Sequence, residues 1–331
     1  IISVIAECDE WQDVTDWARS KQDDLKKYFE LPNGIPSHDT FERVFALINP
    51  QEFEQCFIQW VESIFGSKHR FVHIDGKSLT GSRDVTHGKK MLHLVHAWAS
   101  EQNILLGQVK TEEKSNEITA IPELIALLDL AGSIVTIDAM GCQQEIAKNI
   151  IDAEAEYILA VKDNQKSLHN QIQTAFSHQT IESTNTTEEK SHGRIETRTC
   201  RIITNLELAE ETCKWKSSQS IVEIERIRWI KGKETKEISH YISSLKRDAA
   251  FMNQAVRAHW SVENPLHWSL DVTFREDASR KRKGNQAQNF AILRRIALNV
   301  VRTYKGDNRS IRRRRKMASY EFTYLKDVLK I

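Results

Sequence analysis

The spacing of apolar residues changes near residue 70 of this chain. Before that point they recur every three or four positions, which predicts amphipathic helices. Asp39 and Glu42 have the spacing of a capping box, so we expect a helix to start there. The expected helices lie at 11–29, 41–48 and 51–65, with a polar loop at 31–39.

Short apolar runs typical of strands dominate from residue 70, and helical stretches come between the later ones. Strands are expected at 70–75, 91–100, 104–111, 133–138 and 155–162, and helices at 118–130, 142–152 and 164–176. The resulting order βββαβαβα places a mixed sheet between helices. We therefore predict an α/β fold with an RNase H-like core.

Residues 178–250 break this rhythm. Residues 179–193 are polar and turn-rich, and three β-like segments follow at 197–204, 220–230 and 237–245. We interpret this region as an inserted, mostly antiparallel β region. Helices return at 251–270 and 285–304. The predicted domains are 1–66 (helical), 67–310 (RNase H-like, with the insertion at about 178–250) and 311–331 (a basic tail).

Composition excludes several classes of protein. No window of 18 uncharged apolar residues occurs, so we expect no membrane span, and the N-terminal sequence lacks the features of a signal peptide. Five scattered cysteines without a CxxC pair favour a reducing compartment over a disulfide frame or a cysteine zinc site. His93 and His96 would face opposite sides of a strand, which argues against a zinc pair. Because the chain begins at Ile1, we also expect it to lack its natural N-terminus.

Charge is distributed unevenly although the net charge is only +1. Residues 1–60 carry 5 basic and 12 acidic side chains, whereas residues 246–316 carry 18 basic and 6 acidic ones. The densest basic runs lie at 280–283 and 312–316. This asymmetry predicts a polyanionic partner, with nucleic acid favoured over a merely solvated tail.

Three acidic residues stand out in this pattern. Asp75 and Asp138 each end an apolar strand and precede a turn, and Glu263 lies in an aromatic-rich helical segment. In the predicted fold the two strands are neighbours about 4.8 Å apart, so acids at matching heights can share a metal. Three carboxylates that meet in this way suit two divalent ions and phosphoryl transfer.

Several long stretches resemble the ISAs1 family of bacterial insertion-sequence transposases, which includes the H-repeat-associated proteins. They are HIDGK, KTEEKSNEITAIPELIALLDL, TIDAMGCQ, AVKDNQ, SHGRIETR, YISS and HWSVENPLHWSLDVTFREDASRKRKGNQAQNFAILRRIALN. The segment GIPSHDTFERVFALINP is similar to the N-terminal associated domain of the family. The resemblance therefore covers nearly the whole chain.

This resemblance implies a DDE transposase with Asp75, Asp138 and Glu263 as catalytic residues and metal ligands. It implies Mg²⁺ or Mn²⁺, two ions, and cleavage and strand transfer on double-stranded DNA. The DNA partners would be the terminal inverted repeats and the target, bound by a homodimer. The expected location is the bacterial cytoplasm, at the nucleoid. A catalytically inactive relic that only binds DNA and a plain RNase H-like nuclease remain alternatives.

The segment around the third acid departs from a related signature, Tyr-x2-Arg-x3-Glu-x6-Lys. Aligned on Glu263, the other three positions hold Val256, His259 and Leu270. The residue Glu263 is preferred as the third acid, and Asp271 and Asp277 remain alternatives.

Other side chains are candidates for contacts with DNA. The sequence also offers Trp215 and Trp229 for stacking on an unpaired base, although core packing is the simpler interpretation. We expect Trp260 and Trp268 to face the core. The candidate DNA-binding residues are Lys77, Asn164, His192, Arg194, Arg198, Arg257, His259, Arg280, Lys281, Arg282 and Lys283.

Overall fold

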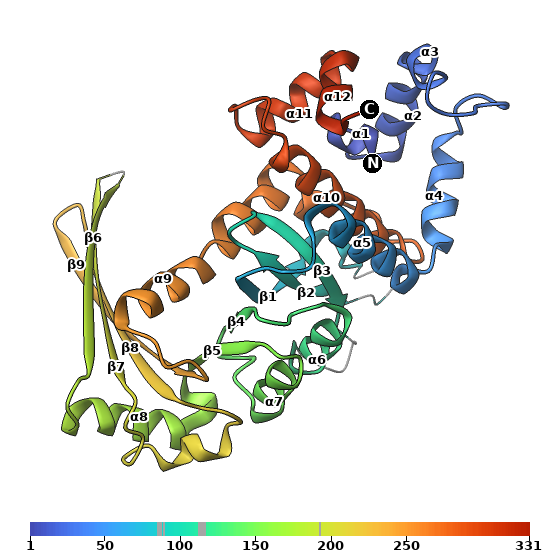
Figure 1. Cartoon of the computed structure of the whole chain (residues 1–331). Coiled ribbons are helices and arrows are strands. Elements are labelled where there is room, and N and C mark those ends of the chain that lie inside the picture. Colours follow the sequence, from blue (N-terminus) through green and yellow to red (C-terminus); the bar gives the residue numbers. More distant parts are fainter. Residues whose placement is uncertain (85–87, 89, 112–116, 192) are drawn as a thin grey trace.

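A single nine-stranded sheet runs through the computed structural model (Figure 1), with the strand order β3-β2-β1-β4-β5-β9-β8-β7-β6. The structure describes residues 1–84, 88, 90–111, 117–191 and 193–331, without the side chains of Ser191, Glu263 and Asn264. The strands are β1 (Phe71–Leu79), β2 (Leu92–Ala99), β3 (Ile104–Lys110), β4 (Ile134–Ile137), β5 (Glu156–Val161), β6 (Ser183–Ser191), β7 (Arg194–Ile203), β8 (Ser220–Ile230) and β9 (Lys233–Ser243).

Strands β1–β5 form the half of the sheet that the apolar runs predict. Strand β1 pairs antiparallel with β2 and parallel with β4, and β4 pairs parallel with β5. This mixed order is that of an RNase H-like core, so the predicted fold class is confirmed. Strand β4 (IVTI) and the first four residues of β1 (FVHI) are buried and mostly apolar because helices cover both faces of the sheet.

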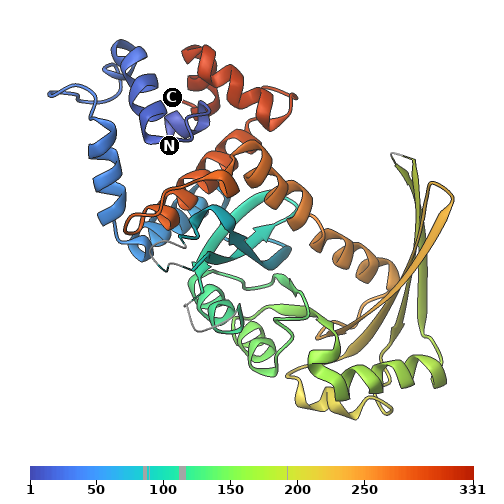
Figure 2. The same ribbon diagram turned by 180° about the vertical axis from the view of Figure 1, so that it is seen from behind.

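Helices cover the two faces of this half in different ways (Figures 1 and 2). On one face pack α6 (Glu117–Leu127) and α7 (Gln144–Asp152); Ile121 of α6 lies close to Ile137 of β4. On the other face lie α9 (Ala249–His259), the π-helical η4 (Val262–Thr273) and α10 (Gln286–Thr303). Helix α5 (Pro50–Phe65) contacts the edge strand β3, and α8 (Lys166–His178) lies near the insertion.

The inserted β region contains four antiparallel strands, β6 to β9, where the sequence predicted three. The extra strand, β6, forms from the segment STNTTEEKS, which we expected to be turn-rich. This segment contains only polar residues and so has no apolar face to bury. Backbone pairing with β7 along the whole length of β6 therefore determines its conformation. Strand β9 pairs with β5, which joins the insertion to the core sheet.

The helix expected at 251–270 is interrupted. Helix α9 ends at His259, and the chain continues as π-helix from Val262 to Thr273 with Pro265 inside it. Proline lacks the backbone N–H that a regular α-helix would use at this position. Wider π-helical turns are often found at functional sites, and this one carries Glu263.

The two ends of the chain lie side by side (Figure 2) and pack around α10. Arg315, fully buried, donates to the carbonyl of Val4 at 2.8 Å. Helix α4 begins after Ser37, whose hydroxyl accepts the N–H of Thr40, so the capping box expected downstream is wrong. The remaining helices here are α1 (Ile2–Ile5), α2 (Trp11–Ser20), α3 (Gln22–Leu25), α4 (His38–Leu47), α11 (Ile311–Tyr320) and α12 (Phe322–Leu329). In the described part of the chain, none of the helices combines the length and apolarity needed to cross a bilayer.

Candidate active site

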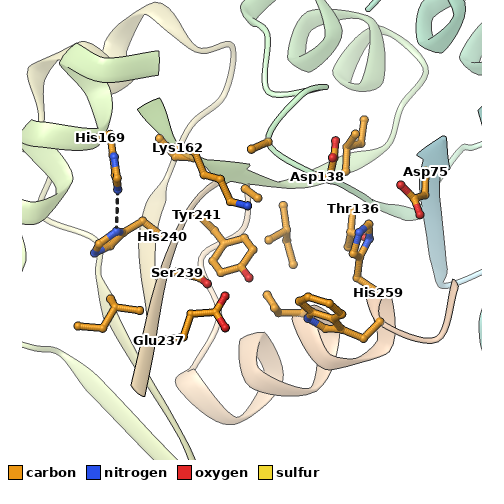
Figure 3. A pocket seen from close by; sticks show the side chains of 18 of the residues that line it. Asp75, Thr136, Asp138, Lys162, His169, Glu237, Ser239, His240, Tyr241 and His259 are labelled. Atoms are coloured by element: carbon orange, nitrogen blue, oxygen red, sulfur yellow. Dashed lines mark hydrogen bonds between the residues drawn. The ribbon is translucent and has the colours of Figure 1, made fainter. Parts of the chain in front are cut away.

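Asp75 and Asp138 lie at the same height on neighbouring parallel strands. Ile74 is paired with Ile137 in the β1–β4 ladder, and each aspartate is the next residue. Both side chains line one cavity of about 390 Å³ between the strand ends, β9 and α9. Figure 3 shows Asp75 and Asp138 on one side of this cavity and His169 and His240 on the other. The structure thus brings the first two predicted acids together.

The turn after β4 holds Asp138 in place. Its Oδ1 accepts the backbone N–H groups of Met140 at 3.1 Å and Gly141 at 3.3 Å. A Cβ at position 141 would lie 2.3 Å from Cγ2 of Ile137, so only glycine allows this close approach. Burial raises the pKa of Asp138, and the negative charge of Glu117 raises it further. A cation beside Asp138 would therefore be favoured electrostatically.

The turn is also held from β5. Asn164 donates its side-chain amide to the carbonyl of Ala139 at 2.6 Å, and Gln165 donates to the carbonyl of Cys142 at 2.9 Å. Asn164 is one of the predicted DNA contacts; here its amide fixes the residue that follows Asp138.

Asp75 has a different environment. Its Oδ1 accepts the N–H of Gly76 at 2.9 Å, and its Oδ2 lies 3.8 Å from Nδ1 of His267. Burial, with smaller effects of the Lys77 and Arg295 charges, lowers the pKa of His267 to about 4. The imidazole beside Asp75 is therefore neutral near pH 7.

The third acid was predicted on the helical segment that follows α9. Glu263 is the second residue of η4, and its side chain lies outside the described ones. The two alternatives, Asp271 and Asp277, have a cationic partner: Lys77 Nζ lies 2.6 Å from Oδ1 of Asp271 and 3.6 Å from Oδ1 of Asp277. Lys77, one of the candidate DNA contacts, is buried here and pairs with both carboxylates.

The donor set suits a hard divalent cation. Asp75 and Asp138 supply carboxylate oxygens, which Mg²⁺ and Mn²⁺ prefer, and both line the same cavity. Within the described residues, no cluster of three His, Cys, Asp or Glu side chains forms a complete metal site. Asp75 and Asp138 are the described carboxylates at this cavity to which such a cation could bind.

The other candidate DNA contacts fall into two groups. In the insertion, Arg198 is buried against Glu196, and Arg194 is half-exposed at 3.9 Å from Glu196. Arg257 of α9 pairs with Glu189 of β6. His192 lies outside the described residues, and His259 lines the cavity beside the aspartates.

The basic run at 280–283 is only partly exposed. Lys281 is buried, bonds to the carbonyl of Asp9 and pairs with Glu10 at 2.9 Å. Arg282 donates to the carbonyl of Gly81 at 3.1 Å, whereas Arg280 and Lys283 are exposed. Part of the basic surplus of the C-terminal third therefore serves internal packing, as the buried Arg294, Arg295 and Arg315 also show.

Sequence reasoning missed two residues close to Asp138. Lys162 follows β5 and lines the cavity, and its charge acts to lower the pKa of Asp138. Glu117 begins α6, is buried and accepts from, or pairs with, His93 Nε2 at 2.7 Å. A lysine just beyond the neighbouring parallel strand was a usable signal for Lys162. Nothing in the sequence indicated that Glu117 would pack under β1.

The tryptophans differ from each other in exposure. Trp215 is buried, so its predicted core packing is confirmed, and Trp229 is 44% exposed at the outer end of β8. Trp260 lines the cavity. Trp268 is 57% exposed, so the expectation that it faces the core is wrong. Its segment is π-helical, which changes the face on which each residue lies.

Comparisons with known proteins identify relatives of this chain. A family model described as Transposase DDE domain matches residues 66–300, and one described as DDE_Tnp_1-associated matches residues 1–61. The chain is 41% identical to the putative transposase YncI of Escherichia coli O157:H7, over 99% of this chain and 87% of that protein. It is 38% identical to the H repeat-associated putative transposase YhhI of Escherichia coli (strain K12), over 99% of this chain and 90% of that protein.

One solved structure is also similar, the piggyBac transposase synaptic complex with hairpin DNA. It matches with a TM-score of 0.45 and 12% identity, over 100% of this chain and 73% of that chain. The two full-length relatives confirm the predicted resemblance to the H-repeat-associated transposases. With 235 of its residues matched by the DDE-domain model (66 to 300), the chain belongs to the family of DDE-domain transposases.

Proposed function

We propose that this protein catalyses divalent-metal-dependent cleavage and strand transfer of DNA at the terminal inverted repeats of an insertion sequence. One observation carries the proposal: Asp75 and Asp138 follow directly paired residues on parallel strands and line the same cavity. Membership of the DDE-domain family supports the same chemistry. We assign Asp75, Asp138 and Glu263 as the catalytic acids.

The described residues fit distinct parts of this reaction. Asp75 and Asp138 direct carboxylates to the point where the scissile phosphodiester would lie. The N–H bonds from Met140 and Gly141 fix one oxygen of Asp138 and so restrict its orientation. Lys162, exposed at the cavity, provides a cation for a non-bridging phosphate oxygen. The exposed Arg280 and Lys283 are suited to bind the DNA backbone more distantly.

Bound Mg²⁺ or Mn²⁺ would lower the pKa of the attacking water or 3′-hydroxyl and stabilise the leaving oxygen. Because an insertion sequence has two ends, we further propose that two copies of the chain act together on DNA. Each copy would then supply its own set of acids to one end.

A cleavage assay tests this function. Purified protein with Mn²⁺ is expected to nick a duplex that ends in the element's inverted repeat, and Asp138→Asn is expected to reduce the rate at least 1,000-fold, about 4 kcal/mol of transition-state stabilisation. Asp23→Asn is the matched control, because the Asp23 side chain is fully exposed on a distant helix. This control should cleave at the wild-type rate.

Each outcome distinguishes between functions. Retention of cleavage by Asp138→Asn would contradict the assignment of this residue. Equal cleavage of duplexes without the inverted repeat would indicate a plain nuclease. Binding of the repeat without cleavage in any divalent metal would indicate a catalytically inactive relic.

A further inference from the structure

Three residues that lie two or four positions before the assigned acids form one hydrogen-bonded network. His73 lies two residues before Asp75 on β1, and Thr136 lies two residues before Asp138, at the end of β4. Residues two apart on a strand share a face. His259 ends α9, and Glu263 follows four residues later as the second residue of η4.

The three side chains are joined by short hydrogen bonds. His259 Nδ1 lies 2.7 Å from Oγ1 of Thr136, which lies 2.6 Å from Nδ1 of His73. The network extends to Ser100, whose Oγ lies 2.8 Å from Nε2 of His73. His73 and Thr136 are buried, and Figure 3 shows Thr136 and His259 together beside Asp75 and Asp138.

The hydroxyl of Thr136 joins the two histidines of this network. Both histidines present Nδ1 to the same hydroxyl, that of the buried Thr136. A hydroxyl has one hydrogen to donate and can accept another, so Thr136 donates to one histidine and accepts from the other. A side chain without that hydroxyl would leave two buried ring nitrogens facing each other without a bridge.

The network also links α9 to the sheet, which backbone hydrogen bonds do not. The ladder between β1 and β4 already fixes the relative height of Asp75 and Asp138. A helix cannot join such a ladder, because its backbone groups bond within the helix. The height of α9 above the sheet, and with it the start of η4, must therefore be set by side chains. Thr136–His259 is one such tie, and Trp98 Nε1 to Oγ of Ser261 at 3.1 Å is another.

We propose that His73, Thr136 and His259 are positioning residues that hold the helix carrying Glu263 in register with Asp75 and Asp138. This inference rests on the proposed function, because it assumes that the three acids bind the divalent metal together. Groups that hydrogen-bond directly to metal ligands typically change metal affinity 10- to 100-fold when they are lost, and a tie that acts through the helix should have an effect at the low end of that range.

Direct Mn²⁺ binding to the full chain, measured by electron paramagnetic resonance of free Mn²⁺, tests the inference without an activity assay. Thr136→Val removes the hydroxyl at nearly constant volume and should weaken Mn²⁺ binding about 10-fold or more. Thr136→Ser keeps a hydroxyl at this position, so its Mn²⁺ affinity should lie within about threefold of wild type. Thr15→Val is the matched control, since Thr15 is also buried but its Oγ1 has no partner among the described residues.

A second pair of variants changes the network at His259 on α9 and leaves the residues of the sheet unchanged. His259→Asn places an amide where Nδ1 lies and should keep the bond to Thr136 and most of the Mn²⁺ affinity. His259→Gln places its amide near the Nε2 position instead and should lose affinity as Thr136→Val does. Thermal unfolding of each variant identifies any that fails to fold, and His259→Gln keeps the test decisive if Thr136→Val is one of them.

Asp138→Asn separates failure of the inference from failure of the proposed function. If Asp138→Asn binds Mn²⁺ as tightly as wild type, the metal assignment fails, and the positioning role fails with it. If Asp138→Asn loses binding while folded Thr136→Val and His259→Gln both keep it, only the positioning role is overturned. Weakened binding in both, together with recovery in Thr136→Ser and His259→Asn, supports it.

Discussion

The two halves of the single sheet are held together by different forces. In the core half, β1 to β5, both faces are covered by helices, and strand residues such as Ile74 and Val135 are fully buried. In the insertion half, β6 to β9, only the inner ends pack closely, against α9 and α8. Further out, charged residues of neighbouring strands pair with one another, as Glu225 does with Lys236 at 2.6 Å.

The comparison shows which half can position catalytic groups. Close packing of buried side chains leaves the core half little freedom to shift, and both aspartates stand on its central strands. The outer insertion depends on backbone pairing and on ion pairs such as Lys236–Glu225, which water screens. Apart from buried pairs such as Arg198–Glu196, single side chains there should contribute less to stability. We therefore expect equivalent substitutions in the two halves to have very different effects.

The largest difference should come from ion pairs. Arg295 and Glu276 are completely buried, whereas Arg226 of the insertion pairs with Glu237, whose side chain is 55% exposed. Glu276→Gln leaves the Arg295 charge uncompensated and should cost about 3–5 kcal/mol of unfolding free energy. Glu237→Gln should cost less than about 1 kcal/mol. Urea unfolding measures both, and equal losses would contradict the distinction between the halves.

Apolar truncations should give a smaller difference. Ile74 is fully buried in β1, and Ile195 is 39% exposed near the outer end of β7. Ile74→Ala creates a cavity and should cost about 2–5 kcal/mol, while Ile195→Ala should cost less than about 1 kcal/mol. The same urea titration compares them. A loss above about 2 kcal/mol for Ile195→Ala would show that the insertion tip is packed more tightly than the structure indicates.

The third difference concerns pH, and its sign differs between the halves. Burial raises the pKa of Glu54, on α5 beside β3, to about 8 from an ordinary value of 4.5. The folded state therefore holds a proton that the unfolded state releases, so this contribution is complete below pH 4.5 and is lost as pH rises through about 8. Between these values, stability should fall by up to about 1.4 kcal/mol per pH unit.

Glu196 of the insertion should behave in the opposite way. Burial acts to raise its pKa, but hydrogen bonds from Arg198 and Arg228 outweigh it and lower the pKa to about 2. Its contribution is present above pH 4.5 and lost as pH falls through about 2. Unfolding measured against pH for Glu54→Gln and Glu196→Gln should remove the alkaline loss in the first variant and the acid loss in the second. An unchanged alkaline slope in Glu54→Gln would contradict the buried, protonated Glu54.

Much of the core half was predictable because its strands carry their own signal. Runs such as IVTI must be buried on both faces, and the order of strands and helices then indicates an RNase H-like sheet. Strand β6 carried no such signal, since its Ser, Thr and Glu residues gain their conformation from β7. The π-helix after His259 was also missed, because the sequence pattern there is helical without specifying the number of residues per turn.

The candidate site was predictable to a similar degree. Two aspartates at the ends of neighbouring strands were predicted to lie close together, and the structure places both on one cavity. The basic runs were predicted less well, because buried cations such as Lys281 and Arg315 cannot be distinguished from exposed ones in the sequence. Their burial depends on Glu10 and Val4, which lie about 270 and 310 positions away and so leave no local pattern.

The sequence by itself determined the α/β class, the family and the acids at the ends of β1 and β4, because hydrophobic periodicity and motif order are properties of neighbouring residues. Only the tertiary structure decided which charges are neutralised internally, such as Lys77 by Asp271, and which polar residues connect the elements that carry the acids. Those contacts join His73, Thr136 and His259 across 186 positions of chain (259 − 73). Interactions between residues that distant depend on how helix and sheet pack, which no short stretch of sequence specifies.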